Sequence, residues 1–244
     1  MEITLATFKT YPLIGLKDIG FGYAPEETVL EGIDFNVFEG DRIHLKGPNG
    51  VGKTTLFYLI LGLLRPKSGH VELFGQICQE EKDFFHARSR IGFLFQDPDH
   101  QLFCPTVLED VCFGPMNHGM TKEEAIKRAN EVLDSLGISH LAKRPPYQLS
   151  GGEKKLAALA TILSMDPEIL LLDEPFNGLD PKARQKTVRI LKDFKGKALV
   201  IVSHYERMPR GLINKVAYLK RDGVLVQEAF STGSSTKKVV PFPG

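Results

Sequence analysis

The chain has 244 residues, with 31 basic and 30 acidic side chains and a formal net charge of +1. This length allows one large α/β domain or two small ones, with enough core to fold without disulfides. The balanced charge excludes a global field that would draw the protein to nucleic acid or to an anionic membrane. Three cysteines without CxxC spacing are typical of reduced thiols in a cytosolic protein, and no apolar stretch is long enough to span a bilayer.

The first predicted region, residues 16–45, has the alternating pattern of antiparallel strands. Large apolar residues alternate with small or polar ones in two runs, at Ile19, Phe21 and Tyr23, and at Ile33, Phe35 and Val37. Tyr23 lies at the end of its run. Its ring could stack on a flat base, as aromatic side chains do in nucleotide binding, or it could simply belong to the core.

The next region carries a phosphate-binding pattern. Residues 47–55 fit GxxxxGK[ST], with an alternating strand before them at 42–46 and a buried helix after them at 54–64. A glycine loop that closes into a helix N-terminus lets backbone N–H groups converge on an anion. In this pattern Lys53 reaches the β- and γ-phosphates and the Thr54 hydroxyl binds Mg²⁺. The alternative is a glycine turn that precedes a lysine by chance.

Two short strands follow, at residues 69–75 and 91–95. The second ends at Gln96, whose side-chain amide could bind a metal or position a water molecule. From about residue 97 to residue 165 strand signals fade, and we expect an inserted helical subdomain. Within it, a capping box at Thr121 opens an amphipathic helix that Gly137 closes.

A second helix of this subdomain begins with Ser150 as N-cap and Glu153 as its capping-box partner. A capped helix needs those two residues, but it does not need Gly151 and Gly152. Each glycine costs about 1 kcal/mol relative to alanine inside a helix. Two glycines at a helix start therefore suggest close backbone approach to a phosphate.

The run at residues 169–172 is continuously apolar, which is typical of a central parallel strand buried on both faces. Ligands of open α/β sheets lie beyond the carboxyl ends of such strands. Asp173 is placed to hold Mg²⁺ and Glu174 to polarise an attacking water. Asp180 and Pro181 then start another helix as N-cap and first residue.

The last predicted core strand, residues 198–202, is followed by His204. A lone histidine is usually structural, but at the end of a parallel strand it is better placed to hydrogen-bond the γ-phosphate or water. The composition of residues 231–238 predicts disorder, and we expect a disordered tail over residues 229–244.

In this order, the motifs resemble those of the ATPase subunit of an ABC transporter, over nearly the whole chain from about residue 16 to residue 226. The matching segments are the Walker A loop at 47–55, the Q-loop glutamine Gln96, the LSGGE signature at 149–153, Walker B with its glutamate at 169–174, the D-loop at 177–180 and the switch histidine His204. Tyr23 falls where the family has a base-stacking aromatic residue.

The resemblance implies an α/β fold: a P-loop NTPase core with a mixed, mostly parallel sheet, an N-terminal antiparallel β subdomain and the inserted helical subdomain, all within residues 1–228. It implies Mg-ATP as cofactor. The implied nucleotide contacts are Tyr23, Asn49, Gly50, Gly52, Lys53, Thr54, Thr55, Ser150, Gly151, Gly152 and Asp180. The implied catalytic residues are Lys53, Gln96, Glu174 and His204, and the implied Mg²⁺ ligands are Thr54, Gln96 and Asp173.

A narrower likeness rests on residues 95–103 and 106–115, which are similar to the ATPases of cobalt/nickel and energy-coupling-factor vitamin importers. It implies a second ATPase subunit, identical or paralogous, together with a transmembrane coupling subunit and a substrate-binding membrane subunit, at the cytoplasmic face of the membrane. Two departures are Leu156, where an arginine commonly follows the signature, and Tyr205, where an aspartate is frequent.

The implied function is ATP hydrolysis coupled to import of a metal ion or vitamin. The alternative is a soluble ABC ATPase that acts on nucleic acid or the ribosome, but the long insertions or tandem domains of such proteins are absent from this sequence. A regulatory module without turnover is disfavoured by the intact Lys53, Asp173 and Glu174. Leu102 and Phe103 are expected to form the docking surface of the membrane partner, unless they seal the helical subdomain against the core.

Overall fold

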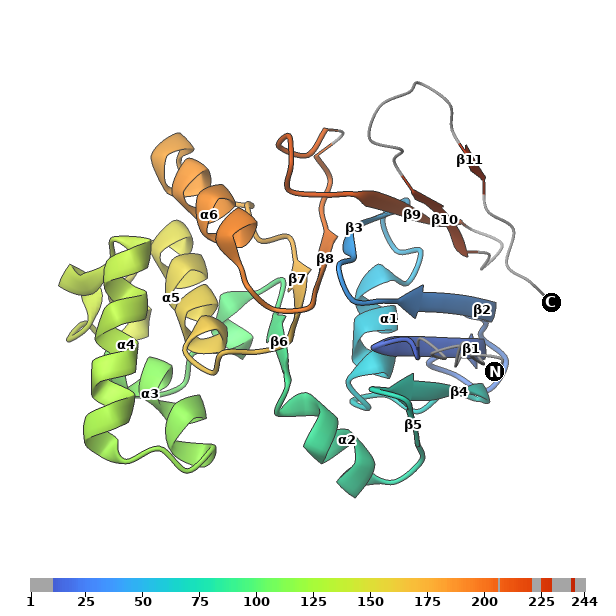
Figure 1. Ribbon diagram of the computed structural model, residues 1–244, viewed down its shortest axis with the longest axis horizontal. Coiled ribbons are helices and arrows are strands. Elements are labelled where there is room, and N and C mark those ends of the chain that lie inside the picture. The colour runs from blue at the N-terminus through green and yellow to red at the C-terminus, as the bar shows by residue number, and fades with distance from the viewer. Residues whose placement is uncertain (1–10, 206, 221–224, 230–237, 240–244) are drawn as a thin grey trace, which may run out of the picture.

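The computed structural model describes residues 11–205, 207–220, 225–229 and 238–239, which form two sheets and a helical region (Figure 1). The strands are β1 (Ile14–Phe21), β2 (Leu30–Val37), β3 (Arg42–Lys46), β4 (Ser68–Leu73), β5 (Gln76–Cys78), β6 (Ile91–Leu94), β7 (Ile169–Asp173), β8 (Ala198–Val202), β9 (Lys215–Leu219), β10 (Leu225–Ala229) and β11 (Lys238–Val239). The α-helices are α1 (Lys53–Ile60), α2 (Glu81–Arg88), α3 (Val107–Asn117), α4 (Lys122–Leu136), α5 (Gly151–Leu163) and α6 (Pro181–Asp193). Short 3₁₀ helices lie at Pro98–His100, Ser139–Leu141 and Pro146–Gln148.

The predicted antiparallel β subdomain is confirmed. In the described residues, four strands pair antiparallel in the order β2-β1-β4-β5. Ile14 at the start of β1 lies opposite Val37 of β2 on one side and Leu73 of β4 on the other. All three side chains are buried, because the period of two along each strand sends these apolar residues to one face.

The second sheet is mixed and mostly parallel, as predicted. In the described residues its order is β11-β10-β9-β3-β8-β7-β6, and the neighbours from β9 to β6 pair parallel while β10 and β11 pair antiparallel. The strands β3, β7 and β8 therefore end at the same edge of the sheet. The residues that follow each of them, including the P-loop, Glu174 and His204, are brought together there.

Between β6 and β7 the chain forms only helical elements and their connections, so the inserted helical subdomain is observed, in green and yellow in Figure 1. Thr121 and Glu124 form the predicted capping box of α4, and Gly137 ends this helix in the left-handed conformation with φ 71°. The helix α1 is shorter than expected, since it ends at Ile60 rather than near residue 64. Gly62 then takes a positive φ, and the Phe84 ring occupies the space where a Cβ would stand.

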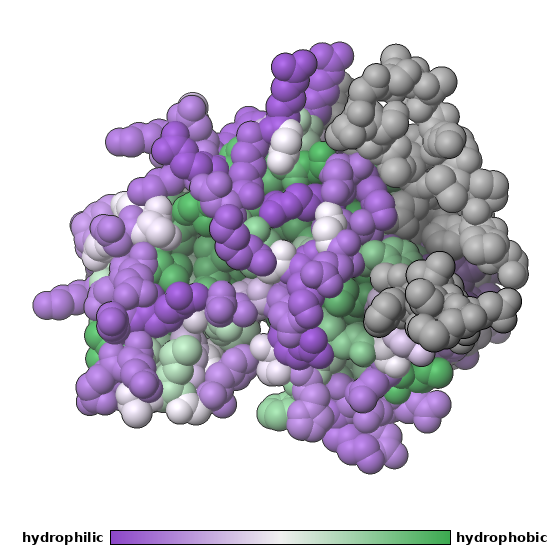
Figure 2. Space-filling model, in the orientation of Figure 1, coloured by the Kyte–Doolittle hydropathy of each residue, from purple (hydrophilic) through white to green (hydrophobic). Residues whose placement is uncertain are grey.

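Apolar side chains gather in two cores. One lies between the antiparallel sheet, α1 and one face of the parallel sheet, and the other joins the opposite face of the parallel sheet to the helical subdomain. On the face drawn in Figure 2, hydrophilic residues cover most of the surface and hydrophobic residues emerge between them. Every helix in the described ranges falls short of the length and hydrophobicity needed to cross a bilayer.

The predicted disordered tail falls mostly outside the described residues, which omit 230–237 and 240–244. Within it, Ala229 ends β10, and Lys238–Val239 pairs with Glu228 and Ala229 as β11.

Candidate functional site

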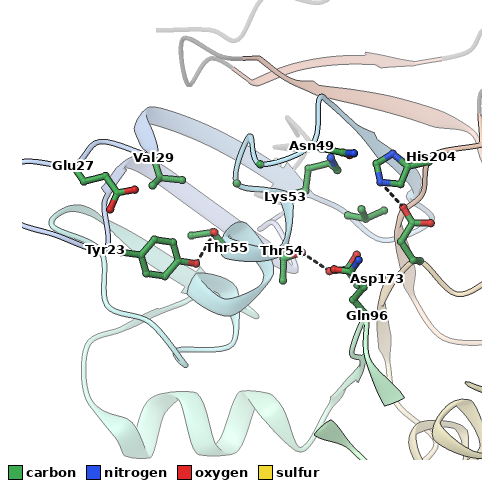
Figure 3. A pocket seen from close by; sticks show the side chains of 14 residues that line it. Tyr23, Glu27, Val29, Asn49, Lys53, Thr54, Thr55, Gln96, Asp173 and His204 are labelled. Carbon is green, nitrogen blue, oxygen red and sulfur yellow. Dashed lines mark hydrogen bonds and ion pairs between the residues drawn. The ribbon is translucent and has the colours of Figure 1, made fainter. Parts of the chain in front are cut away.

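A cavity of about 440 Å³ lies at the shared carboxyl edge of the parallel strands. The structure brings eleven of the predicted site residues to its wall: Tyr23, Asn49, Gly50, Gly52, Lys53, Thr54, Thr55, Gln96, Asp173, Glu174 and His204. Glu27, Val29 and Val202, which the sequence did not single out, complete the lining. Figure 3 shows Tyr23, Glu27 and Val29 on one side of the P-loop residues, and Gln96, Asp173 and His204 on the other.

The P-loop links β3 to α1 with a backbone that requires glycine. Gly50 and Gly52 have φ angles of 74° and 102°, a region that side-chain-bearing residues rarely adopt. Gly52 is the N-cap of α1, and a Cβ on it would lie 2.8 Å from the Leu30 side chain. The first N–H groups of α1 therefore face the cavity without a capping side chain, which is the arrangement that binds phosphate.

Lys53 is folded back onto the loop. Its Nζ donates hydrogen bonds of 2.8 Å to the carbonyl oxygens of Gly47 and Pro48. Burial lowers the pKa of this lysine, and the nearby carboxylates of Asp173 and Glu174 oppose that shift. A buried cation between two carboxylates and an open cavity is suited to an anionic ligand.

The Thr54 hydroxyl donates a hydrogen bond of 2.5 Å to Asp173 Oδ2 (Figure 3). Asp173 is buried, and burial raises the pKa of its carboxyl group while the bond from Thr54 lowers it. A hydroxyl and a carboxylate are hard oxygen donors of the kind that Mg²⁺ prefers, so this pair fits the ion. In the described residues no group of three His, Cys, Asp or Glu could hold a metal by itself. A bound Mg²⁺ would therefore need further oxygen ligands from outside this pair.

Glu174 follows β7 in a strained conformation, with φ 50°, which costs about 1 kcal/mol or more for a residue with a side chain. Its N–H donates to the carbonyl oxygen of Val202 at 2.9 Å, which holds the turn. The side chain is buried, and Oε1 has no hydrogen-bond partner although His204 Nε2 lies 3.3 Å away. Burial raises the pKa of Glu174, and His204 opposes the shift. A buried carboxylate oxygen that accepts no hydrogen bond in the described residues, and whose ion-pair partner is His204, is suited to accept a proton from water.

Tyr23 lies just beyond β1, with its ring packed edge-on against Phe21 and its hydroxyl 2.9 Å from Thr55 Oγ1. The residue is 62% exposed, so of the two interpretations left open by the sequence, the structure does not support a core role. An exposed ring fixed at both ends beside the cavity is a surface on which a base can stack.

Four predicted nucleotide contacts do not line this cavity. Ser150 is the N-cap of α5 and forms the predicted capping box with Glu153, while Asp180 caps α6 by accepting from the N–H groups of Lys182 and Ala183. Both are exposed. Gly151 and Gly152 are likewise absent from the cavity wall.

The two signature glycines differ. A Cβ on Gly152 would lie 2.8 Å from the carbonyl oxygen of Gly178, so the close approach predicted for this glycine comes from the D-loop of the same chain. A Cβ on Gly151 would meet nothing within 4 Å. In the described residues, no neighbouring atom therefore requires a glycine at this exposed helix start.

Sequence reasoning missed two residues beside the site. Lys155 of α5 is buried and bonds the carbonyl oxygens of Phe95 and Gln96, and Gln101 bridges the same segment to α5. The available signal was that Lys155 lies next to Leu156 on the apolar, buried face of the helix, where a lysine needs a partner.

The expected docking surface is wrong for Leu102, and for Phe103 it stays a prediction. Leu102 is buried in the core of the helical subdomain. Phe103 is 67% exposed and packs edge-on against Phe113, which is also exposed, with ring centroids 4.9 Å apart. Of these two adjacent side chains, only that of Phe103 faces solvent.

The fold and the cavity together define a P-loop protein that binds a nucleotide in a glycine-rich loop at the edge of a parallel sheet. A family model described as ABC transporter matches residues 30–177. The chain therefore belongs to the ABC transporter family, as one of its ATP-binding and ATP-hydrolysing subunits.

Two relatives are named as energy-coupling factor transporter ATP-binding protein EcfA. The protein from Methanocaldococcus jannaschii is 42% identical over 88% of this chain and 78% of its own, and the one from Methanosphaera stadtmanae is 44% identical over 79% and 70%. Among solved structures, cbiO1 from Clostridium perfringens, described as part of the ABC transporter complex cbiONQ, has a TM-score of 0.75 at 34% identity and covers 88% of both chains. The ATP-binding cassette MJ0796, a post-hydrolysis dimer bound to ADP and Pi, has a TM-score of 0.80 at 30% identity, covering 88% of this chain and 98% of its own.

Proposed function

We propose that this chain drives an importer for a metal ion or a vitamin by binding and hydrolysing ATP between two ATPase subunits. In each site, one subunit supplies the P-loop cavity and the other supplies the N-terminus of α5 with Ser150 and Gly151. ATP closes the pair, hydrolysis removes the bridging phosphate, and the pair opens. That motion drives the membrane subunits between outward and inward states.

The observation that carries this proposal is the separation of the two halves of the site within one chain. The P-loop, Gln96, Asp173, Glu174 and His204 share a cavity, whereas the exposed N-terminus of α5 is outside it. The positive end of the helix dipole favours an anion, and the two glycines that follow the Ser150 N-cap carry no side chain that would block its approach. A second subunit can bring this helix end to the γ-phosphate.

Within the cavity, each residue has a role that its position supports. Tyr23 stacks the base, the backbone from Asn49 to Gly52 with Thr55 surrounds the phosphates, and Lys53 leaves its loop carbonyls to bind them. Thr54 and Asp173, with Gln96 nearby, would hold Mg²⁺, which would neutralise phosphate charge. Glu174 accepts the proton of the attacking water, and His204 holds its carboxylate and the γ-phosphate. Asp180, in the D-loop, faces the second subunit.

The choice of an importer rests on the relatives. The names EcfA and cbiO1 belong to subunits of energy-coupling-factor and cbiONQ transporters, and residues 95–103 and 106–115 are similar to those of such ATPases. We infer a peripheral position at the cytoplasmic face of the membrane, with a coupling subunit and a substrate-binding subunit as partners.

A mixing experiment tests the shared site. Gly151→Asp places a charge at the α5 N-terminus, and Lys53→Ala disables the P-loop, so each variant alone should lack ATPase activity. A mixture contains dimers in which the intact P-loop of one subunit meets the intact α5 of the other, and activity should return. A mixture as inactive as its components, with active wild type in the same assay, would overturn the two-subunit site.

A purification tests the transport role. Affinity isolation of the tagged chain from solubilised membranes of its own cells should recover integral membrane proteins, and metal analysis and mass spectrometry should find a bound metal ion or vitamin. Recovery of ribosomes or DNA without membrane subunits would instead support a soluble ABC ATPase.

A further inference from the structure

The lysine that sequence reasoning missed lies between the two halves of the site. Lys155 of α5 is only 3% exposed, and its Nζ donates hydrogen bonds to the carbonyl oxygens of Phe95 at 3.2 Å and Gln96 at 2.5 Å. Because both acceptors are backbone carbonyl oxygens, this lysine fixes the path of the main chain at Gln96 rather than the position of the Gln96 side chain. Burying an ammonium group is costly unless such partners are present.

The same segment is fastened to α5 at a second point. Gln101 Oε1 accepts the N–H of Phe95 at 3.3 Å, and its Nε2 donates to the Ala158 carbonyl oxygen at 2.8 Å and to Thr161 Oγ1 at 2.7 Å. Phe95 is thus held through both its N–H and its carbonyl group. Residues 155, 158 and 161 are about one helical turn apart, so one face of α5 carries all these contacts.

Lys155 also interacts with the cavity through electrostatic attraction. Asp173 and Glu174 are adjacent, buried carboxylates, and two such groups need a nearby cation. Burial lowers the pKa of Lys155, and the charges of Asp173, Asp97 and Glu174 oppose that shift. The ammonium group therefore attracts the carboxylates of the cavity, although it does not line the cavity wall.

We propose that Lys155 is a positioning residue that makes residues 95–101 and the N-terminal half of α5 move as one body. This inference rests on the proposed two-subunit site. A shift of Gln96 toward the γ-phosphate of its own cavity would then carry Ser150 and Gly151, which serve the partner's cavity. The lysine would thus link occupancy of one ATP site to closure of the other.

The test uses the full chain with Glu174→Gln, which should accumulate ATP-bound dimers, and adds Lys155→Met, a substitution of similar length that lacks the donors. We expect the melting temperature to match that of the parent. The affinity of the monomer for a fluorescent ATP analogue should stay within about twofold of the parent's. The ATP concentration that gives half-maximal dimer in analytical ultracentrifugation should rise about tenfold or more, since hydrogen bonds from a charged donor are lost.

Lys154→Met is the matched control. Lys154 is the preceding residue of α5 and, in the described residues, its one ion pair reaches the same 95–101 segment at Asp99, whose side chain is 61% exposed. Exposed ion pairs contribute little, so the loss of Lys154 should change the three measurements far less than the loss of the buried Lys155. Lys155→Gln, which keeps an N–H donor without the charge, should recover part of the dimerisation, and it carries the test if the methionine variant does not fold.

The inference is overturned if Lys155→Met dimerises like the parent, if analogue affinity falls in parallel with dimerisation, or if Lys154→Met has the same effect. It is also overturned if the folded Lys155→Gln variant dimerises no better than Lys155→Met. Failure of the Glu174→Gln parent to dimerise with ATP would instead refute the proposed two-subunit site, and the role of Lys155 with it.

Discussion

Thr54 and Asp173 are joined by a hydrogen bond of 2.5 Å across 119 residues of sequence. Thr54 lies in the first turn of α1 and Asp173 ends β7, and the parallel pairing of β3, β8 and β7 brings them to one edge of the sheet. A hydroxyl and a carboxylate held this closely are suited to coordinate the same cation.

This pairing predicts a conflict between stability and function at Asp173. Burial raises the pKa of its carboxyl group, so the folded chain favours the protonated form, and the stability gained from that form is lost as pH rises through the folded-state pKa. A neutral amide avoids the cost of burying a charge, so Asp173→Asn should raise the free energy of unfolding at pH 7 and weaken Mg-ATP binding. Urea unfolding and nucleotide titration measure both. Lower stability would show that the charge is already compensated.

Glu174→Gln should retain ATP binding and reduce turnover by about a hundredfold or more, in line with losses of a general base. The glutamine keeps the size of the side chain but cannot accept a proton from water. Equilibrium binding of ATP measures the first effect, and phosphate release measures the second. Unchanged hydrolysis would remove Glu174 from the mechanism.

The two signature glycines should respond differently to alanine. Gly152→Ala places a Cβ against the carbonyl oxygen of Gly178 and should cost about 1–3 kcal/mol of stability. Gly151→Ala has open space and should leave the melting temperature unchanged, while ATPase activity falls because the new methyl group intrudes on the partner's phosphate. Activity equal to wild type in Gly151→Ala would argue against a phosphate at this helix end.

Leu102 and Phe103 provide a matched pair for partner docking. Phe103→Asp changes an exposed ring, so it should abolish copurification with the membrane partner and leave the melting temperature and nucleotide affinity nearly intact. Leu102→Asp places a charge in the core of the helical subdomain and should cost several kcal/mol. A large drop in melting temperature for Phe103→Asp, or unaltered transport, would contradict the docking role.

His44 makes stability depend on pH. It is buried in β3 with Nε2 3.0 Å from the Ser203 carbonyl oxygen, and burial lowers its pKa to about 4 from an ordinary 6.5. A lowered histidine pKa stabilises the fold fully above pH 6.5, and this contribution is lost as pH falls toward about 4. The slope should be about 1.4 kcal/mol per pH unit at most. His44→Gln should remove it from urea-unfolding data, and an identical slope in that variant would exclude His44 as the cause.

The sequence by itself determined the elements whose signals are local. The capping boxes at Thr121 and Ser150, the N-cap at Asp180 and the continuously apolar strand before Asp173 all formed where their residues predicted, because caps and periodicity depend on neighbours within one or two turns. The P-loop, Gln96, Glu174 and His204 could be assigned to one edge because parallel strands end together.

Only the tertiary structure decided which face of each segment meets which neighbour. It buried Leu102 while exposing Phe103, placed Gly178 against Gly152, and sent Lys155 to the carbonyl groups of a segment about 60 residues earlier in the chain. Such contacts join residues far apart in sequence, and no local period or cap encodes the partner of a buried polar group. Their physical basis is close packing and the need of each buried donor for an acceptor, and these are settled only when the whole chain has folded.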